Sequence, residues 1–600
     1  MKKEKPDSLA MLQNYFEAAE DNTISARNES ERARDYVDGK QLTAGEITEL
    51  KKRGQPPVII NRIRRKVEWL LGLEVKQRTD PKAFPRTPQH QQDAEAVTDA
   101  IRFVCDNEDW DQKRSDAYDN MLVEGLGGVE VVHEMRGERV EVVVNQYPWD
   151  RLFFDPYSRR ADFSDARYKG VVLWMDYEDF VNQFPDAKDH VSEMMGIDAS
   201  TTGADGYSSG GNAQTYDDKP NHWMDAKRKR VRVVMIWFRE NNEWHWWKFI
   251  KGHKLEGGKS PYVDGDGATV CPLIMQSAYV GRENERYGIV RDMFDPQDEV
   301  NKRRSKALHG INSRQTMGPK GAVDSVAEMK RQMAMPDGHI EYDAAYAQDG
   351  VKPFEVIQTA DMTMGNLNLL QEAKQEIDLL GANSALEGET GENTSGRAVL
   401  ARQQGGMIEI ANLHDKLHLF TREVYRQIWL RIKQFWTEER WIRVTDDDRN
   451  ARFVTINKQI TLNEALGQMP QEQAIQAARE LQLYPNDPRL QAVVGQQNVV
   501  AELDVDIVLE EVPDRVTLEG EMFEALMKYA QTGAIPPAVL IEADPGLPTK
   551  KKEKLLEMMQ QTQPTPAEQL DMADKEAGVH VKRAQANKLN AEAMPLAGIA

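Results

Sequence analysis

Cysteine is almost absent from this chain of 600 residues, which contains only Cys105 and Cys271. These two residues lie far apart and match no metal-binding spacing, so the sequence predicts neither a disulfide framework nor a zinc knuckle. Such sparse use of cysteine fits assembly in a reducing, intracellular environment. The chain also lacks any run of 18 apolar residues, and the start MKKEKPDSLA is followed by a polar, acidic segment. We therefore expect no membrane-spanning helix and no signal peptide.

An excess of positive charge is also missing. Asp and Glu number 98 against 77 Lys and Arg, which gives a formal net charge of −21. Tight binding of nucleic acid normally requires a clustered basic surface, so this balance argues against a conventional nucleic-acid-binding protein. Any contact with DNA must be local or weak. A chain of 600 residues is long enough for three or four domains with large buried cores.

Familiar enzyme signatures are missing as well: there is no G-x-S-x-G elbow, dinucleotide-binding fingerprint or Cys/His nucleophile arrangement. The segment GHKLEGGKSP resembles a phosphate-binding loop, but His253 stands where that motif requires glycine, so we interpret it as the exit of a hairpin. The segment DGDG at 264–267 resembles the start of a calcium loop, yet its twelfth position is Met275 rather than glutamate, so we predict a turn. We therefore expect a protein that is not an enzyme and needs no cofactor or metal.

The strongest enzyme signal is the pattern H-D-x-x-H formed by His414, Asp415 and His418. Histidines four residues apart share one face of a helix and can bind zinc, so a zinc-dependent hydrolase is the alternative function. Asp415 stands where a metallopeptidase carries glutamate, and no third ligand is evident downstream. Because the apolar stripe of the same helix passes beside both histidines, we interpret them as helix-surface or interface residues.

Apolar residues at helical spacing predict several helices. One lies between the prolines at 56 and 57 and the Asp-Pro pair at 80 and 81, and its apolar positions are Ile63, Val67, Leu70, Leu71 and Val75. Longer helices are expected over 284–308, 361–381 and 397–440. The last of these has an apolar stripe formed by Ile410, Leu413, Leu417, Phe420, Val424, Ile428 and Phe435.

Alternating apolar and polar residues predict two β-hairpins. The first covers 128–145 and turns at Arg136 and Gly137, and the second turns at Asn241 and Asn242, which tolerate the positive φ of a tight turn. The basic run KRKRVRV at 227–233 leads into the second hairpin, and we interpret it as a solvated strand edge. A strand is also expected over 498–512, and strand-like pieces such as GHIEYDA are expected in a compact insert over 309–360. The segment TTGADGYSSGGNAQTYDD predicts a surface loop.

Three segments together resemble the portal proteins of short-tailed bacteriophages. The segment YPWDRLFFDPYSRRADFSDARY at 147–168 is similar to that family's wing signature, with an aromatic pair, Asp-Pro and a later Ser-Asp-Ala. The segment YGIVRDMFDPQDEVNKRRSKAL at 287–308 is similar to the helix that runs along the channel, including Asp295, Pro296, Gln297, Val300 and Asn301. The segment GANSALEGETGENTSGRAVLARQQGG at 381–406 resembles the loop and helix start that narrow the tunnel. Their order in the chain also fits this family.

The resemblance implies a mostly helical α+β, multidomain subunit of a ring with a central channel. The implied domains are a wing over 1–280, a first stem helix over 281–308, a clip over 309–360, a second stem helix over 361–381, a tunnel loop over 382–396, a wing part with a long helix and returning strands over 397–512, a crown over 513–575, and the start of a helical barrel or tail over 576–600.

In function, the resemblance implies a homododecamer at one capsid vertex through which double-stranded DNA passes during packaging and ejection. The implied partners are the terminase large subunit, which hydrolyses ATP, head-to-tail adaptor proteins, the major capsid protein and scaffolding protein, with motor and adaptor docking at 309–360. The chain would be a virion component assembled in the host cytoplasm, without a membrane partner. Another ring-forming connector is a nearer alternative than the zinc hydrolase, although such proteins are usually much shorter.

The same resemblance places candidate site residues on the first stem helix and in the tunnel loop. Arg303, Arg304 and Lys306 would lie nearest the DNA, or would pair with acidic residues of the neighbouring subunit. In the loop, three carboxylates would form acidic rings in the bore, and glycines would let the backbone rearrange. The loop residues are Glu387, Gly388, Glu389, Gly391, Glu392, Asn393 and Gly396.

Overall fold

The computed structural model describes residues 8–76, 78, 81–85, 91–201, 223–225, 228–312, 315–335, 337–346, 355–357, 360–379, 396–445, 451–462, 488–497 and 505–509, with single residues at 526 and 540. The chain divides into two units, one of Met1–Val444 and Ala451–Glu510 and the other of Thr445–Asn450 and Glu511–Ala600. The first unit contains the elements discussed below. The expected glycine-rich surface loop, the tunnel loop up to residue 395, the crown and the tail lie outside the described residues.

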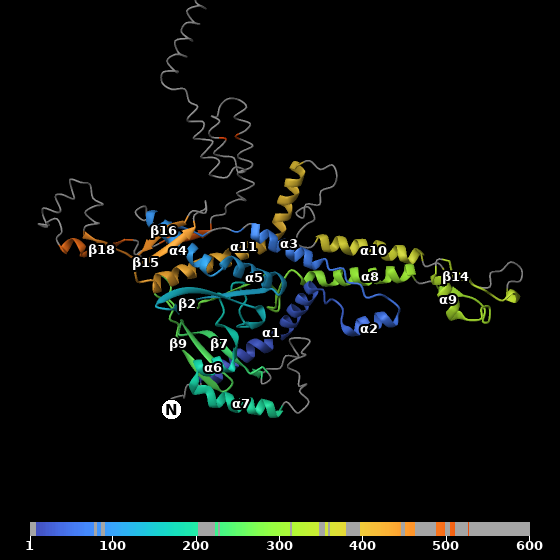
Figure 1. The fold of residues 1–600 in the computed structure, drawn as a ribbon, viewed down its shortest axis with the longest axis horizontal. Coiled ribbons are helices and arrows are strands. Elements are labelled where there is room, and N and C mark those ends of the chain that lie inside the picture. The colour runs from blue at the N-terminus through green and yellow to red at the C-terminus, as the bar shows by residue number, and fades with distance from the viewer. Residues whose placement is uncertain are drawn as a thin grey trace, which may run out of the picture. The chain divides into compact units, whose positions relative to one another are not determined.

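Helices contribute more of the described residues than strands, and this mixed content confirms the expected α+β class. The helices are α1 (Ser8–Asp38), α2 (Ala44–Lys52), α3 (Ile63–Lys76), α4 (Gln91–Asn107), α5 (Trp110–Val123), α6 (Tyr177–Gln183), α7 (Lys188–Thr201), α8 (Phe294–Asn312), α9 (Val326–Ala334), α10 (Ala360–Leu379) and α11 (Gly396–Phe435). Figure 1 shows their arrangement.

The larger sheet has the strand order β4-β5-β7-β8-β9, with β6 paired to β7, and a second sheet has the order β10-β2-β3. Short two-stranded pairs join β1 to β19, β11 to β12, β13 to β14, β15 to β16 and β17 to β18. The strands are β1 (Pro81–Pro85), β2 (Leu126–Arg136), β3 (Arg139–Tyr147), β4 (Leu152–Phe154), β5 (Tyr168–Asp176), β6 (Met224–Asp225), β7 (Arg230–Glu240), β8 (Glu243–Ile250), β9 (His253–Lys259), β10 (Leu273–Ser277), β11 (Tyr279–Val280), β12 (Arg286–Tyr287), β13 (Gln315–Met317), β14 (Glu355–Ile357), β15 (Arg440–Thr445), β16 (Ala451–Ile456), β17 (Lys458–Thr461), β18 (Val493–Gln497) and β19 (Val505–Leu509).

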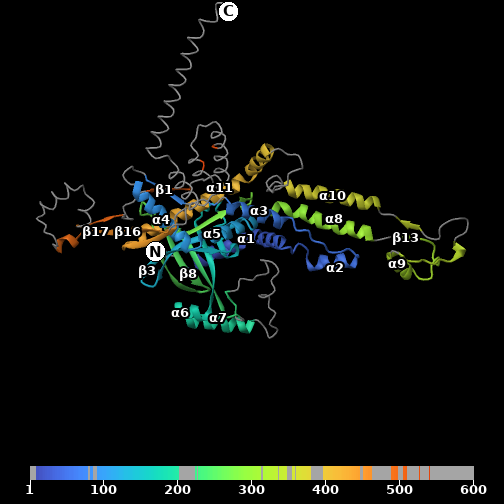
Figure 2. The ribbon, with the colours of Figure 1, turned by 45° about the horizontal axis from the view of Figure 1, so that its top comes forward.

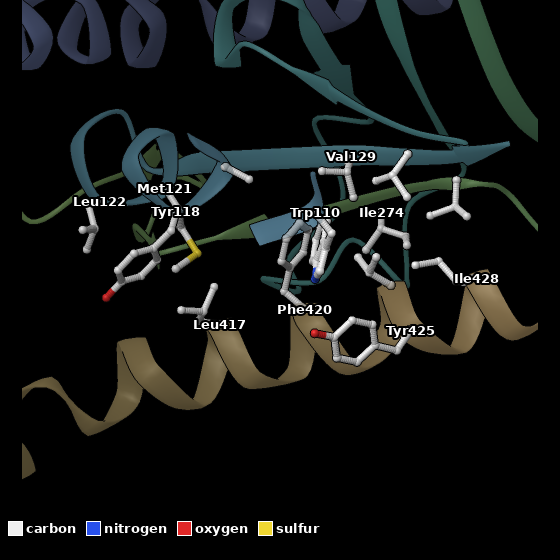
Figure 3. Packing of buried hydrophobic residues seen from close by; sticks show 14 of the residues in the cluster. Trp110, Tyr118, Met121, Leu122, Val129, Ile274, Leu417, Phe420, Tyr425 and Ile428 are labelled. Atoms are coloured by element: carbon white, nitrogen blue, oxygen red, sulfur yellow. The ribbon is translucent and has the colours of Figure 1, made fainter. Parts of the chain in front are cut away.

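The main hydrophobic core lies between α11 and the β10-β2-β3 sheet. The predicted stripe of α11 is buried from Ile410 to Ile428 and packs against side chains of α5, β2 and β10, as Figure 3 shows. Trp110 at the start of α5 is 1% exposed and lies within 6.3 Å, between ring centroids, of Phe420 on α11. Phe435, the last residue of the stripe, is only partly buried and packs beside a smaller core. The periodicity of α11 therefore identified this core correctly.

Helix α1 joins two separate cores. Its first half buries Leu12, Phe16 and Ala19 against the larger sheet, and its second half buries Ala33, Tyr36 and Val37 in the main core. Between these halves, Arg27 donates hydrogen bonds to the carbonyl oxygens of Asp150 (3.1 Å) and Leu152 (2.5 Å). These bonds satisfy the donors of a charged guanidinium group that water does not reach. They therefore fix the position of α1 along the sheet.

Both predicted hairpins are present, with one small change. Asn241 and Asn242 have φ of 52° and 67° and form the two-residue turn between β7 and β8. In the β2–β3 hairpin Arg136 pairs with Arg139, so the turn residues are Gly137 and Glu138 rather than Arg136 and Gly137. Gly137 has φ of 69°, which explains why glycine stands there.

The predicted helix over 284–308 begins ten residues late, at Phe294, and extends to Asn312. Arg286 and Tyr287 instead form strand β12. At Gly288 a Cβ atom would lie 2.1 Å from the carbonyl oxygen of Leu122. The backbone here packs directly against the backbone of α5, and the side chains that surround a helix would prevent this close approach. The expected helix over 361–381 is confirmed as α10, and that over 397–440 ends at Phe435 and is followed by β15.

Other predictions were wrong because tertiary contacts decide them. The basic run is solvated as expected at residues 228–230, which are exposed, but it does not lie at a sheet edge, because β7 is paired on both sides. Within the run, Arg232 is 8% exposed and forms an ion pair with Glu20 of α1. Val75 is 51% exposed, whereas its neighbour Glu74 is buried and pairs with Arg114 of α5. The GHIEYDA segment forms no strand, and the strands of the insert are β13 and β14.

Candidate functional site

Helices α8 and α10 lie side by side, and the short β13–β14 pair connects their far ends (Figures 1 and 2). Their contact is a small apolar cluster of Val300 on α8 with Leu370, Ala373 and Ile377 on α10, each at most 3% exposed. These three α10 positions recur at spacings of three and four, so they form one face of the helix. Helices α8 and α10 therefore pack against each other through one apolar face and are joined by a small insert.

A ladder of polar side chains attaches α8 to an extended segment, residues 54–62. Along one face of α8, four residues spaced by four positions bind the backbone of this segment. Gln297 bonds to Ile60 O (2.7 Å) and Arg62 N (3.2 Å), and Asn301 Oδ1 accepts from Ile60 N (2.9 Å). Farther along, Ser305 donates to Pro56 O (2.7 Å), and His309 Nδ1 lies 3.0 Å from Gly54 O.

The ladder is buried at its inner end, since Gln297 is 0% and Asn301 is 2% exposed. Asn301 Nδ2 also donates to Gln41 Oε1 (2.6 Å), so the amide is bonded on both sides. A buried amide that lost one partner would leave a polar group without water, at a cost of roughly 1–3 kcal/mol. The ladder thus sets the position of α8 relative to the N-terminal segment.

Helix α10 is attached at its C-terminal end by two basic side chains, Arg62 just before α3 and Lys66 in the first turn of α3. Arg62 donates to both carboxylate oxygens of Asp378 (2.7 and 2.9 Å), and Lys66 donates to Asp378 O (2.9 Å). Cations near the last carbonyl groups of a helix are favourable to its dipole. The base of the α8–α10 pair is therefore held on both helices.

The three predicted cations do not share one face of α8. Arg303 pairs with Glu299 on the same helix (2.8 Å) and reaches Asn366 of α10 (3.4 Å). Arg304 and Lys306 are two residues apart, which places them about 200° apart around the helix. Arg304 is partly buried and Lys306 is exposed, and within the described residues neither forms an ion pair.

Sequence reasoning missed Lys302, which lies one turn before Lys306 on the same side of α8. The Lys302 side chain is 61% exposed and lies 3.7 Å from Asp298, a surface contact that holds it only weakly. Helix α10 packs on the face of α8 that contains Val300, and the 54–62 segment packs on the face that contains Gln297 and Asn301. The side with Lys302 and Lys306 is covered by neither of them. The spacing of four in the sequence was the signal that could have identified this pair.

The tip of the helical pair carries a concentration of exposed large hydrophobic side chains. Among the described residues of the tip, Ala322 and Met329 are buried. A two-stranded pair such as β13–β14 is only marginally stable by itself in water. The exposed side chains are Ile311, Met317, Val326, Met335, Tyr342 and Tyr346.

The predicted tunnel-loop residues Glu387, Gly388, Glu389, Gly391, Glu392 and Asn393 lie outside the described residues, and Gly396 is the first residue of α11. The structure therefore does not test whether they come together.

The histidines of the zinc alternative lie on α11 with their ring centroids 6.0 Å apart. Both are partly exposed, and Asp415 is exposed. Among the residues that the structure describes, no group of three or more His, Cys, Asp or Glu is suited to holding a metal. The neighbouring Lys416 donates to Ala278 O and lies over the Tyr279 ring, and burial lowers the pKa of its amine. Lys416 lies about 200° around α11 from His414, so these contacts belong to another side of the helix.

Comparison with known proteins identifies the family of the chain. The sequence profile of a family described as Phage P22-like portal protein matches residues 13–243 and 239–597. The chain belongs to the P22-like phage portal protein family. It is also similar to the portal protein of Helicobacter pylori bacteriophage KHP30, with 22% identity over 459 residues that cover 74% of this chain and 70% of that protein. As a phage portal protein, the chain is a structural, non-enzymatic component of the virion at the capsid vertex.

The family match confirms the resemblance seen in the sequence and gives no support to the zinc-hydrolase alternative. None of the helices in the described part of this portal protein combines the length and the apolarity that crossing a bilayer requires.

Proposed function

We propose that this portal protein forms a dodecameric ring at one capsid vertex and conducts double-stranded DNA during packaging and ejection. The terminase motor and the tail adaptor would dock on the same ring, and the major capsid protein and scaffolding protein would contact its periphery. Assembly would take place in the host cytoplasm. The observation that carries the proposal is the α8–α10 helical pair, which is fixed at its base and has an apolar tip.

The proposed domain layout follows the sequence prediction, with helix bounds taken from the structure. Residues 1–280 and 397–512 would form the wing, α8 and α10 the stem, and the residues between them the clip. The tunnel loop would cover 382–396, the crown 513–575, and the tail or barrel start 576–600. A stem built from two helices per subunit gives a rigid wall, because each helix is held by side chains from outside the pair.

Within this stem we assign the DNA-facing role to Lys302 and Lys306, with Arg303 at the margin of the same surface. The predicted Arg304 lies on the opposite side of α8. Twelvefold symmetry converts each lysine into a ring of cations. A net charge of −21 per chain makes most of the assembly repel DNA, so these rings would guide the duplex without holding it. Glu387, Glu389 and Glu392 in the tunnel loop would add acidic rings that oppose adhesion, and Gly388, Gly391 and Gly396, with Asn393, would allow the loop to move.

The ring is tested by negative-stain imaging and native mass spectrometry of the purified chain. A twelvefold ring with a central hole is expected. A protein that stays monomeric under all conditions, including those of capsid assembly, would contradict the proposal.

The stem assignment is tested by DNA packaging with Lys302→Gln/Lys306→Gln subunits. Packaging should slow, and more so at low salt, because the missing cations are screened less there. A matched control replaces two exposed lysines away from the stem, Lys229→Gln/Lys251→Gln, and should package normally. Equal rates for both double variants would remove the role of the stem lysines.

The tunnel-loop assignment is tested by replacing Glu387, Glu389 and Glu392 with lysine. The three rings would then attract phosphates, so packaging should slow or stall. Unchanged packaging would remove this role.

A further inference from the structure

The loop between β4 and β5, residues 155–167, holds an aromatic side chain in solvent on a rigid backbone. Tyr157 is 89% exposed, although tyrosine usually buries its ring. Its neighbours Arg159 and Arg160 are also exposed, and within the described residues neither forms an ion pair. Tyrosine and arginine are the residue types that most often dominate the energy of a protein interface.

The loop is held in place by hydrogen bonds to two of its own carboxylates, the buried Asp155 and the exposed Asp165. Asp155 accepts from Tyr157 N (3.0 Å) and Arg167 N (3.1 Å), and Asp165 accepts from Ser158 Oγ (2.6 Å) and Arg159 N (2.8 Å). The loop carboxylates are thus occupied within the loop, whereas its arginines are exposed.

A second loop braces the first from outside. Asn284 Nδ2 donates to Pro156 O and Ser158 O (both 2.6 Å), and the buried Arg286 donates to Ser158 O (2.7 Å). Arg286 in turn stacks over the Phe154 and Phe163 rings. Little conformational entropy remains to be lost when Tyr157 binds a partner, because its backbone is already fixed.

The opposite end of the same sheet carries a row of exposed carboxylates, beside the exposed basic residues 228–230 at the start of β7. Helix α6 begins directly after β5 ends, and β5 has nine residues, so this end lies roughly 25–30 Å from the loop. Exposed carboxylates on α6, on α7 and in the turn between them have no ion-pair partner in the described part of the chain: they are Glu178, Asp179, Asp186, Asp189 and Glu193. Lys188 is the one lysine or arginine within this 178–193 stretch.

We propose that the Tyr157 loop of one subunit docks on the α6–α7 surface of the neighbouring subunit. A closed ring needs a head-to-tail contact, in which two different surfaces of the same chain meet. A Tyr/Arg loop and a carboxylate surface at opposite ends of one strand meet this need by charge and by position. The inference rests on the proposed ring, and it adds a specific contact between subunits.

The test measures ring assembly of the purified full-length chain by native mass spectrometry and sedimentation. Tyr157→Ala should weaken each contact roughly 30-fold, as expected for truncation of an interface hot spot. The charge reversals Arg159→Glu/Arg160→Glu and Asp186→Lys/Asp189→Lys should each shift the population to monomers. Raised salt should weaken assembly of the wild-type ring.

The decisive variant combines both reversals in one chain, since this restores opposite charges across the contact. Rings should reappear at about the wild-type subunit concentration. A matched control reverses two exposed arginines that also have no ion pair in the described residues, Arg139→Glu/Arg422→Glu, and should assemble normally. Far-ultraviolet circular dichroism confirms that each variant is folded.

The outcomes separate this inference from the proposed function. If the wild-type chain forms rings and the loop variants assemble like the control, the loop contact is overturned but the proposed ring is not. The same holds if the combined variant does not rescue the two charge reversals. Absence of wild-type rings would overturn the proposed ring and this contact with it.

Discussion

Glu130 provides the sharpest physical test of the core around β2, because its carboxyl group is buried and lies in no ion pair among the described residues. It lies on β2, is 3% exposed, and accepts hydrogen bonds from Tyr147 Oη (3.0 Å) and Trp237 Nε1 (3.3 Å). No ion pair of Glu130 is found among the described residues. Burial raises the pKa of its carboxyl group from 4.5 to about 7, and the two hydrogen bonds only partly oppose this rise.

The sign of the effect on stability follows from the raised pKa. The folded protein holds this proton more tightly than the unfolded chain, so the contribution of Glu130 is most favourable below pH 4.5, declines as pH rises, and is constant again above pH 7. A shift from 4.5 to about 7 corresponds to about 3 kcal/mol of lost stability above pH 7. Glu130→Gln removes the ionisation and keeps one oxygen that accepts from Trp237 Nε1. Its NH2 group can donate to Tyr147 Oη, because a tyrosine hydroxyl both donates and accepts.

We therefore expect Glu130→Gln to be nearly neutral at pH 4.5 and stabilising by about 3 kcal/mol at pH 8, the difference set by the pKa rise to about 7. The assay is urea unfolding followed by tryptophan fluorescence, which includes Trp237, at a series of pH values. Other titrating groups are identical in the two proteins and cancel in the difference. Glu138→Gln, in the exposed β2–β3 turn, is the control and should show no such trend. A stability difference independent of pH would refute the reasoning.

Two further predictions concern how α8 and α10 are held. Asn301→Ala should lower the free energy of unfolding by roughly 2–3 kcal/mol and speed hydrogen exchange of residues 54–62, because it leaves buried polar groups without partners. The control Lys302→Ala, at the exposed neighbouring position, should change neither quantity. Gly288→Ala should destabilise the protein by more than about 2 kcal/mol in thermal or urea unfolding, because the new Cβ atom would overlap backbone atoms. Gly365→Ala in α10 should instead stabilise it by roughly 0.5–1 kcal/mol, because no atom lies within 4 Å of the new Cβ atom and alanine favours the helix. Equal effects of the two glycine substitutions would contradict this reading of the close contact.

The sequence determined those features that depend on neighbouring residues. The stripe of α11, the helix α10 and the Asn241–Asn242 turn were all predicted, because helical spacing and tolerance of positive φ are local properties. The portal resemblance also rested on local segments and their order, and it was confirmed by the family match.

Only the tertiary structure decided which charged and polar side chains are available. The ladder joins residues more than 230 positions apart in the chain, such as Gln297 and Ile60, and no local pattern reports such a contact. Likewise, Arg232 can be buried because α1 supplies Glu20 as its ion-pair partner. Lys302 and Lys306 remain exposed because α10 and the 54–62 segment pack on other faces of α8. Periodicity states that a face exists, whereas the packing of distant segments determines what covers it.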